Sequence, residues 1–154
     1  MASTYIQVQT EDFDIAHETA VMRDPEGNVG AIATFTGLVR DLQDDSLKEM
    51  FLEHYPGMTE KSLERIADQA RERWELMDIR IIHRVGALHP CDQIVFVAVS
   101  SAHRVDSFAA CQFIMDYLKK DAPFWKKETT TDKDHWVEQK ESDLQAADGW
   151  DGKS

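Results

Sequence analysis

The sequence predicts a single α+β domain in which a mixed or antiparallel sheet packs against helices. Segments rich in Ile and Val alternate with segments whose apolar residues recur at three- and four-residue steps, and strand-like segments outnumber helix-like ones. The 154 residues are enough for one real core and too few for two ordinary domains. We expect the domain to span residues 1–140, followed by a loosely held, polar and acidic tail over residues 141–154.

The first third of the chain predicts two strands and one short helix. Tyr5 to Gln9 alternates apolar and polar residues, as a half-buried strand does, and a short helix is expected from Asp12 to Met22. A turn cluster at residues 24–28 then precedes a small-residue strand, Gly30 to Gly37, whose bracketing glycines indicate close approach of backbone or ligand. The acidic stretch Asp41 to Ser46 is expected to be a loop.

The middle third predicts three more strands around one helix. Met50 to Tyr55 is an expected strand, and Thr59 is the expected N-cap of the helix that follows. The apolar residues of this helix share one face: Leu63, Ile66, Ala67, Ala70 and Trp74. Ile79 to Val85 and Gln93 to Ser100 are expected to pair across a turn at residues 88–92, with the second strand central.

The last third predicts a helix and a hairpin. The helix runs from Arg104 to Lys119, with Phe108, Cys111, Met115 and Leu118 on one apolar stripe. Pro123 prevents its continuation. Phe124 to Thr130 and His135 to Glu138 are then expected to form the hairpin.

The overall charge excludes several classes of function. With 17 basic and 29 acidic side chains, a net charge of −12 argues against a broad nucleic-acid or anionic-membrane surface. The longest apolar run, Ile94 to Val99, is too short to span a membrane, and no leader pattern is present. Cys91 and Cys111 match neither a metal site nor a disulfide framework, so we expect a cytoplasmic protein without bound metal.

A local concentration of cations contrasts with this acidic background. His103 and Arg104 open the last predicted helix, where free N–H groups and the helix dipole favour an anion. Simple capping explains these two residues equally well. Lys119 and Lys126 could converge around the Pro123 bend, although a lysine at a helix edge commonly extends into solvent. Arg40 could add a guanidinium suited to phosphate.

Several blocks of sequence carry a family resemblance. They are LEHYPGMTEK at 52–61, IHRVG at 82–86, SAHR at 101–104, FIMDYLK at 113–119 and APFWKKE at 122–128. In this order, and within a region from about Gly30 to about Ala147, the blocks resemble the large, catalytic subunit of molybdopterin synthase. The resemblance implies an α/β-hammerhead-like core with extra antiparallel strands.

The resemblance also implies an activity and its partners. It implies a sulfurtransferase that converts cyclic pyranopterin monophosphate into the dithiolene molybdopterin. Sulfur would arrive as a thiocarboxylate on the Gly-Gly terminus of a small ubiquitin-like partner subunit. Two large subunits would form a homodimer, and with two small subunits a heterotetramer. No metal or cofactor is required, because the sulfur arrives already activated.

Positions matching the family receive roles by resemblance. Lys119 is similar to the lysine at the end of the tail-binding channel, and Lys126 to a second catalytic pocket lysine. By the same resemblance, the substrate-binding residues are Arg40, His103 and Arg104, which hold the pterin phosphate with some contributed across the dimer, Phe35 and Met115, which line the pocket, and Glu128, a polar residue near the site. At Lys140 the family pattern leads us to expect arginine, and lysine lacks the bidentate fork.

Two other functions fit the same residues. One is a non-catalytic dimeric module that binds an anionic metabolite or a protein Gly-Gly tail. The other is an acid–base hydrolase built on His103 and Glu128, which would act without a partner protein.

Overall fold

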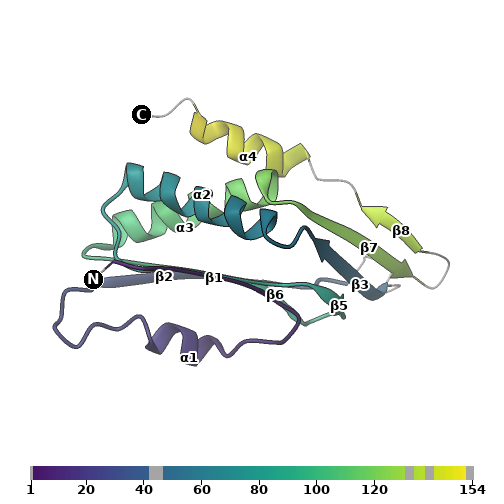
Figure 1. Ribbon diagram of the computed structural model, residues 1–154, viewed down its shortest axis with the longest axis horizontal. Coiled ribbons are helices and arrows are strands. Elements are labelled where there is room, and N and C mark those ends of the chain that lie inside the picture. Colours follow the sequence, from purple (N-terminus) through teal and green to yellow (C-terminus); the bar gives the residue numbers. More distant parts are fainter. Residues whose placement is uncertain (1, 42–46, 131–133, 138–140, 152–154) are drawn as a thin grey trace.

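The Ile- and Val-rich segments form the two inner strands of the first sheet. The computed structural model describes residues 2–41, 47–130, 134–137 and 141–151 (Figure 1). The first sheet has the order β1 (Thr4–Gln9), β4 (Ile79–Arg84), β6 (Gln93–Ser101) and β2 (Ala31–Leu38). Only its β1–β4 pair is parallel. The predicted pairing of β4 with β6, and the inner position of β6, are therefore confirmed.

A second sheet extends from one end of the first. Its order is β5 (Gly86–Leu88), β3 (Leu47–His54), β7 (Phe124–Thr130) and β8 (Asp134–Val137), antiparallel throughout. The predicted β7–β8 hairpin is confirmed. Between β4 and β6 the sequence predicted only a turn, but β5 forms there and pairs with β3. Gly86, with φ of 89°, allows this redirection because it lies in the left-handed region.

Helices α2 (Met58–Arg73) and α3 (Arg104–Asp121) cover one face of the first sheet (Figure 1). The predicted apolar face of α2 is buried at Leu63, Ile66, Ala67 and Ala70. On α3, Cys111, Met115 and Leu118 are buried as expected, but Phe108 is 66% exposed, so its assignment to the buried stripe was wrong. Ser107 and Ala110 occupy the buried positions on that turn, which places Phe108 toward solvent.

The opposite face of the first sheet is covered by the segment around α1 (Ile15–Ala20). Phe13 and Met22, which flank this helix, pack on Ile82, Phe96 and Ala98. The helix is shorter than the predicted 12–22 because Asp14 caps it by accepting hydrogen bonds from the N–H groups of residues 16 and 17. The sheet is thus covered on both faces.

Residues 141–151 form a helix where the sequence predicted a loosely held tail, and residues 152–154 of that tail lie outside the described residues. Helix α4 (Glu141–Asp151) lies on α3 (Figure 1). Ala147 is fully buried, and the Trp150 indole donates a hydrogen bond of 2.6 Å to Asp116. Lys120, next to Lys119 in α3, forms an ion pair of 2.9 Å with Asp148. Ala147 and Trp150 therefore face α3 and the core.

The two sheets and four helices confirm the predicted α+β class for the described residues. Among those residues, no helix combines the length and the apolar character that a bilayer crossing requires. The acidic stretch 41–46 falls outside the described residues from position 42 onward, as does Lys140.

Candidate functional site

The two predicted catalytic lysines lie on either side of the turn that joins α3 to β7. Lys119 is in the last turn of α3 and is exposed, and Lys126 is a half-buried residue of β7. In the β3–β7 register, Lys126 is opposite Leu52 and Phe124 is opposite His54. Because alternate residues share a face, Phe124 and Lys126 lie on the same side of the second sheet.

A buried histidine that sequence reasoning left without a role lies at this turn. His83, on β4, is only 6% exposed, and its ring stacks on Phe124 with centroids 3.8 Å apart and planes 17° apart. Its Nδ1 is 2.8 Å from the Arg84 carbonyl oxygen. The sequence held a signal for this burial: His83 is two residues after Ile81 and four after Ile79 on β4, so it lies on the same buried face of the strand.

The pKa of His83 reflects its burial and the charges near it. Burial lowers the pKa of His83 from its ordinary 6.5 to about 4, and the Arg84 carbonyl opposes this shift. The positive charges of Lys119, Lys126 and His54 lower the pKa further. Both lysines therefore lie near a histidine that is neutral at neutral pH, and Lys126 shares its face of β7 with the Phe124 ring that stacks on His83.

Thr59 holds the turn in place. Its Oγ1 accepts a hydrogen bond of 3.1 Å from the Tyr55 N–H and donates one of 3.2 Å to the Pro123 carbonyl. The prediction that Thr59 caps α2 was wrong. The N-cap is Gly57, whose φ of 87° favours glycine and whose N–H donates to the Glu60 side chain at 3.2 Å. The Thr59 side chain instead links the start of α2 to the bend at Pro123 through its hydrogen bond to the Pro123 carbonyl.

Arg40 lies at the same end of the first sheet as the lysines. Leu38, near it, pairs with Gln93 at the start of β6, and α3 begins where β6 ends and returns across the sheet. Reciprocal backbone bonds of 2.8 Å tie Val39 to the loop before β6, at the N–H of Cys91 and the carbonyl of Asp92. The Arg40 side chain is exposed beyond this anchored residue.

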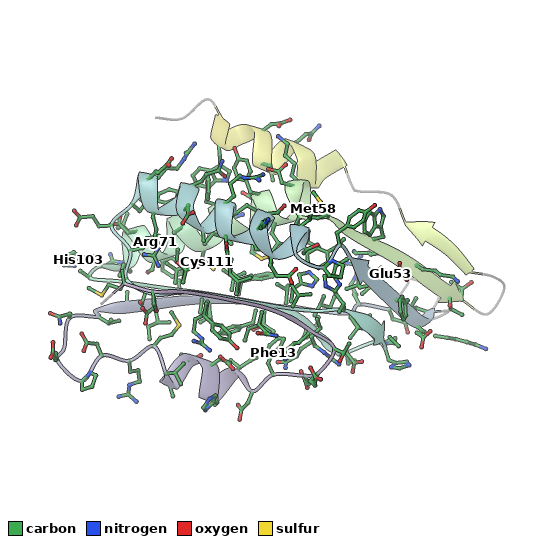
Figure 2. All side chains as sticks on the ribbon, in the orientation of Figure 1. Phe13, Glu53, Met58, Arg71, His103 and Cys111 are labelled. Carbon is green, nitrogen blue, oxygen red and sulfur yellow. The ribbon has the colours of Figure 1, made fainter. Side chains whose placement is uncertain are left out.

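His103 and Arg104 lie at the other end of α3. Both are exposed at its N-terminus, where His103 is the cap residue and makes no side-chain cap hydrogen bond. Figure 2 shows His103 at this end of the molecule. Lys119 is sixteen positions after His103, which corresponds to about 24 Å along the axis of α3. One chain therefore does not bring these two residues to the lysines, nor His103 to Glu128 on β7 as the hydrolase reading requires.

The remaining predicted residues differ in exposure. Met115 is 8% exposed and belongs to the main core, whereas Phe35 on β2 is 42% exposed. Glu128 is half-buried two residues beyond Lys126, on the same face of β7. Of these three, only Glu128 shares the face of β7 that carries Phe124 and Lys126.

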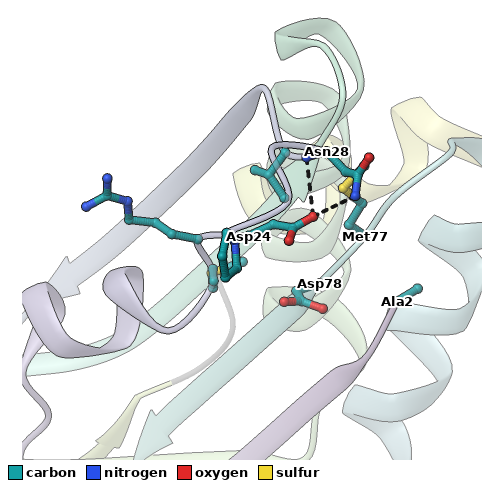
Figure 3. Close-up of a pocket in the computed structure, with 9 residues that line it drawn as sticks. Ala2, Asp24, Asn28, Met77 and Asp78 are labelled. Carbon is teal, nitrogen blue, oxygen red and sulfur yellow. Dashed lines mark hydrogen bonds between the residues drawn. The ribbon is translucent and has the colours of Figure 1, made fainter.

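A cavity of about 460 Å³ lies away from the lysines (Figure 3). Asp24, Asn28, Met77 and Asp78 line it, and the N–H of Met77 bonds to the Ser100 carbonyl near the end of β6. Hydrogen bonds from the Glu26 N–H and then from Asn28 lower the pKa of Asp24. Its lining contains neither Lys119 nor Lys126, so this cavity is not the cationic site.

Comparisons with known proteins decide the family. Residues 8–121 match the family model described as MoaE protein. The molybdopterin synthase catalytic subunit of Escherichia coli is 52% identical over 151 residues, which are 97% of this chain and 100% of that protein. The chain belongs to the MoaE family.

Other MoaE relatives extend the comparison. The molybdopterin synthase catalytic subunit of Ralstonia nicotianae is 55% identical over 94% of this chain and 83% of its own length. The MoaE protein of Burkholderia ambifaria has a solved structure with a TM-score of 0.83 and 52% identity, covering 99% of this chain and 100% of that one. Molybdopterin synthase from Staphylococcus aureus gives a TM-score of 0.78 at 31% identity, covering 85% and 95%. The predicted family resemblance is confirmed.

Proposed function

We propose that this chain is the catalytic subunit of a molybdopterin synthase. In this role it converts cyclic pyranopterin monophosphate into the dithiolene molybdopterin, with sulfur from the C-terminal thiocarboxylate of a small ubiquitin-like partner. Full-length relatives that carry this name support the proposal. The observation that supports it most directly is that Lys119, in the last turn of α3, and Lys126, on β7, lie on either side of the turn where Phe124 stacks on His83.

Positive charge is what this reaction needs. The thiocarboxylate, the substrate phosphate and the oxyanion that forms when the acyl–sulfur bond breaks are all negative. A preorganised cationic site stabilises such charge most strongly where water is partly excluded. We assign Lys119 to the thiocarboxylate, as charge stabiliser or proton donor, and Lys126 beside it, with Glu128 as a polar neighbour on the same face.

The partner is a separate small subunit with a Gly-Gly terminus. A solved complex from Helicobacter pylori joins subunits 1 and 2 of a molybdopterin-converting factor; at 16% identity and a TM-score of 0.71 it supports the fold of this chain alone. The 52% identity to a whole catalytic subunit supports the partnership. Both cysteines are free, which agrees with a reducing compartment, and we place the protein in the cytoplasm.

A second copy of the chain completes the substrate site. Arg40 lies at the lysine end, but His103 and Arg104 are about 24 Å from Lys119 along α3. A two-fold dimer can bring the start of α3 of one copy to the lysine end of the other. Apolar side chains that such a contact would cover are exposed on α3 and the edge strand β2: Phe35, Leu38, Val105 and Phe108.

Sulfur transfer from a thiocarboxylated partner to the cyclic precursor tests the catalytic role. Lys119→Ala and Lys126→Ala are each expected to reduce dithiolene formation at least a hundredfold, because each removes charge aimed at the developing anion. Lys127→Ala is the matched control, since alternation places Lys127 on the opposite face of β7. Complex formation without product by the unchanged protein would identify a non-catalytic binding module.

Mixed dimers test the shared site. A dimer with His103→Ala in one chain and Lys119→Ala in the other, purified through two different tags, keeps one intact site if each site uses both chains. It is expected to show about half of wild-type activity, although each variant alone is inactive. An inactive mixed dimer would place His103 and Lys119 in the same chain's site and overturn the dimer arrangement.

A further inference from the structure

His83 combines three features that its role as a core residue does not require. Only 6% of His83 is exposed, its ring stacks on that of Phe124, and it lies near the positive charges of Lys119 and Lys126. A leucine would fill the same space without bringing two ring nitrogens into the interior. The imidazole therefore calls for a functional explanation.

The hydrogen bond at Nδ1 determines what the other nitrogen can do. A carbonyl oxygen only accepts, so the 2.8 Å contact with the Arg84 oxygen means that Nδ1 carries the proton. In the neutral ring Nε2 is then an acceptor with a free lone pair. The tautomer is fixed by the backbone of the same strand.

This lone pair is accessible. Within the described residues, Nε2 makes no hydrogen bond, and no buried side-chain nitrogen or oxygen there lacks a partner. Nε2 must therefore reach the protein surface, although the ring as a whole is buried. His83 stacks on Phe124, which shares a face of β7 with Lys126, so the ring lies beside the face that carries this lysine.

The two lysines of the site supply only donors, and Glu128, on the same face of β7 as Lys126, is an acceptor that carries negative charge. Lysine ammonium groups only donate hydrogen bonds, so Lys119 and Lys126 can bind an anion but cannot accept from a donor. A Gly-Gly tail has no side chains, and its backbone N–H groups must find acceptors when they are buried. A carboxylate acceptor would neutralise a lysine, whereas a neutral imidazole accepts without reducing the positive charge.

We propose that Nε2 of His83 accepts a hydrogen bond from a backbone N–H of the partner's C-terminal Gly-Gly segment, making His83 a tail-binding residue. This inference rests on the proposed function, because it presupposes a glycine-ended partner. The lysines bind the anion at the end of the tail, and His83 accepts a hydrogen bond from the peptide that precedes it. The extended tail is thereby held in register with Lys119.

Two substitutions separate this role from packing. His83→Phe keeps a ring stacked on Phe124 and removes the acceptor. His83→Gln loses the ring but can place its amide oxygen near the position of Nε2. Thermal unfolding of both variants establishes that each is folded before binding is compared.

Calorimetric titration with the small partner, either intact or lacking its last two glycines, is the test. His83→Phe is expected to weaken binding of the intact partner about tenfold, since one hydrogen bond is lost, and to leave binding of the truncated partner unchanged. His83→Gln is expected to stay within about threefold of wild type for both partners. Equal weakening toward both partners, or none, would overturn the role.

A spectroscopic readout is independent of affinity. The ¹⁵N resonances of His83 are expected to show the Nδ1–H tautomer in the free protein, with the Nε2 resonance shifting on binding of the intact partner only. A shift caused by the pterin precursor instead would assign the acceptor to substrate. Failure of wild type to bind any glycine-ended partner would refute the proposed function itself, whereas unchanged affinity of His83→Phe for the intact partner would refute only the inference.

Discussion

Acidification is expected to destabilise the folded protein through His83. Because this ring is buried beside Lys119 and Lys126, its pKa falls from 6.5 to about 4 on folding. Between these two values the unfolded chain binds a proton at His83 and the folded chain does not. The free energy of unfolding therefore falls as the pH drops from 6.5 to 4, and the effect is absent above pH 7.

The size of this effect follows from the shift. A difference of about 2.5 pKa units at about 1.4 kcal/mol per unit corresponds to about 3 kcal/mol at pH 4. This is a large part of the stability of an ordinary domain, about 5–15 kcal/mol. Since His83 is only 6% exposed, solvent screening does not reduce the effect much.

Urea unfolding of wild type and His83→Gln at pH 7, 6, 5 and 4 measures the contribution of His83 to the pH dependence of stability. Other titrating groups, such as Asp12 and Asp24, contribute equally to both proteins and cancel in the difference. The stability advantage of wild type over His83→Gln is expected to fall by about 3 kcal/mol from pH 7 to pH 4. His89→Gln, at a surface position, controls for the loss of one histidine. A pH-independent difference for His83→Gln would refute the reasoning, because it would mean that His83 protonates as easily in the folded state as in the unfolded state.

Two further predictions concern the supports of the site. Gly30→Ala is expected to lower the free energy of unfolding, measured in urea, by at least about 2 kcal/mol, because a Cβ there would lie 2.0 Å from the Ala102 carbonyl oxygen. Gly149→Ala is the control: the position has open space around it in α4, so this variant is expected to be as stable as wild type or more stable in the same assay. Thr59→Val is expected to lower the free energy of unfolding by about 1–3 kcal/mol, since it leaves the Tyr55 N–H without its acceptor. It is also expected to slow sulfur transfer, because the hydrogen bond to the Pro123 carbonyl is lost and the bend is held less firmly. Unchanged stability would show that the hydrogen bonds of Thr59 contribute nothing.

Most helices and strands were predicted correctly, because they depend on residue types and spacings within a short stretch of the chain. Ile and Val alternation identified β4 and β6, and the spacing of Leu63, Ile66 and Ala70 identified the buried face of α2. The glycine before β2 indicated a close approach, and the backbone of Ala102 is what approaches Gly30. The family blocks predicted the family, which the comparisons confirm.

Long-range contacts account for the errors. Helix α4 was mistaken for a loose tail because its acidic composition hides the burial of Ala147 and the contact of Trp150 with Asp116. Thr59 was mistaken for a cap because its partner, the Pro123 carbonyl, is 64 residues away in the sequence. Phe108 was placed in the buried stripe because the spacing of apolar residues fixes the face of a helix only to within one position.

The sequence by itself determined the fold class, the family and the chemical need for positive charge near Pro123, because these depend on residue types and short spacings. Only the tertiary structure decided which cations meet. It brings Lys119 and Lys126 to His83, and it separates His103 and Arg104 from them by the length of α3. The physical reason is that a helix fixes distance along its axis, whereas the packing of β4, β7 and α3 at one end of the sheet joins residues that are far apart in the chain.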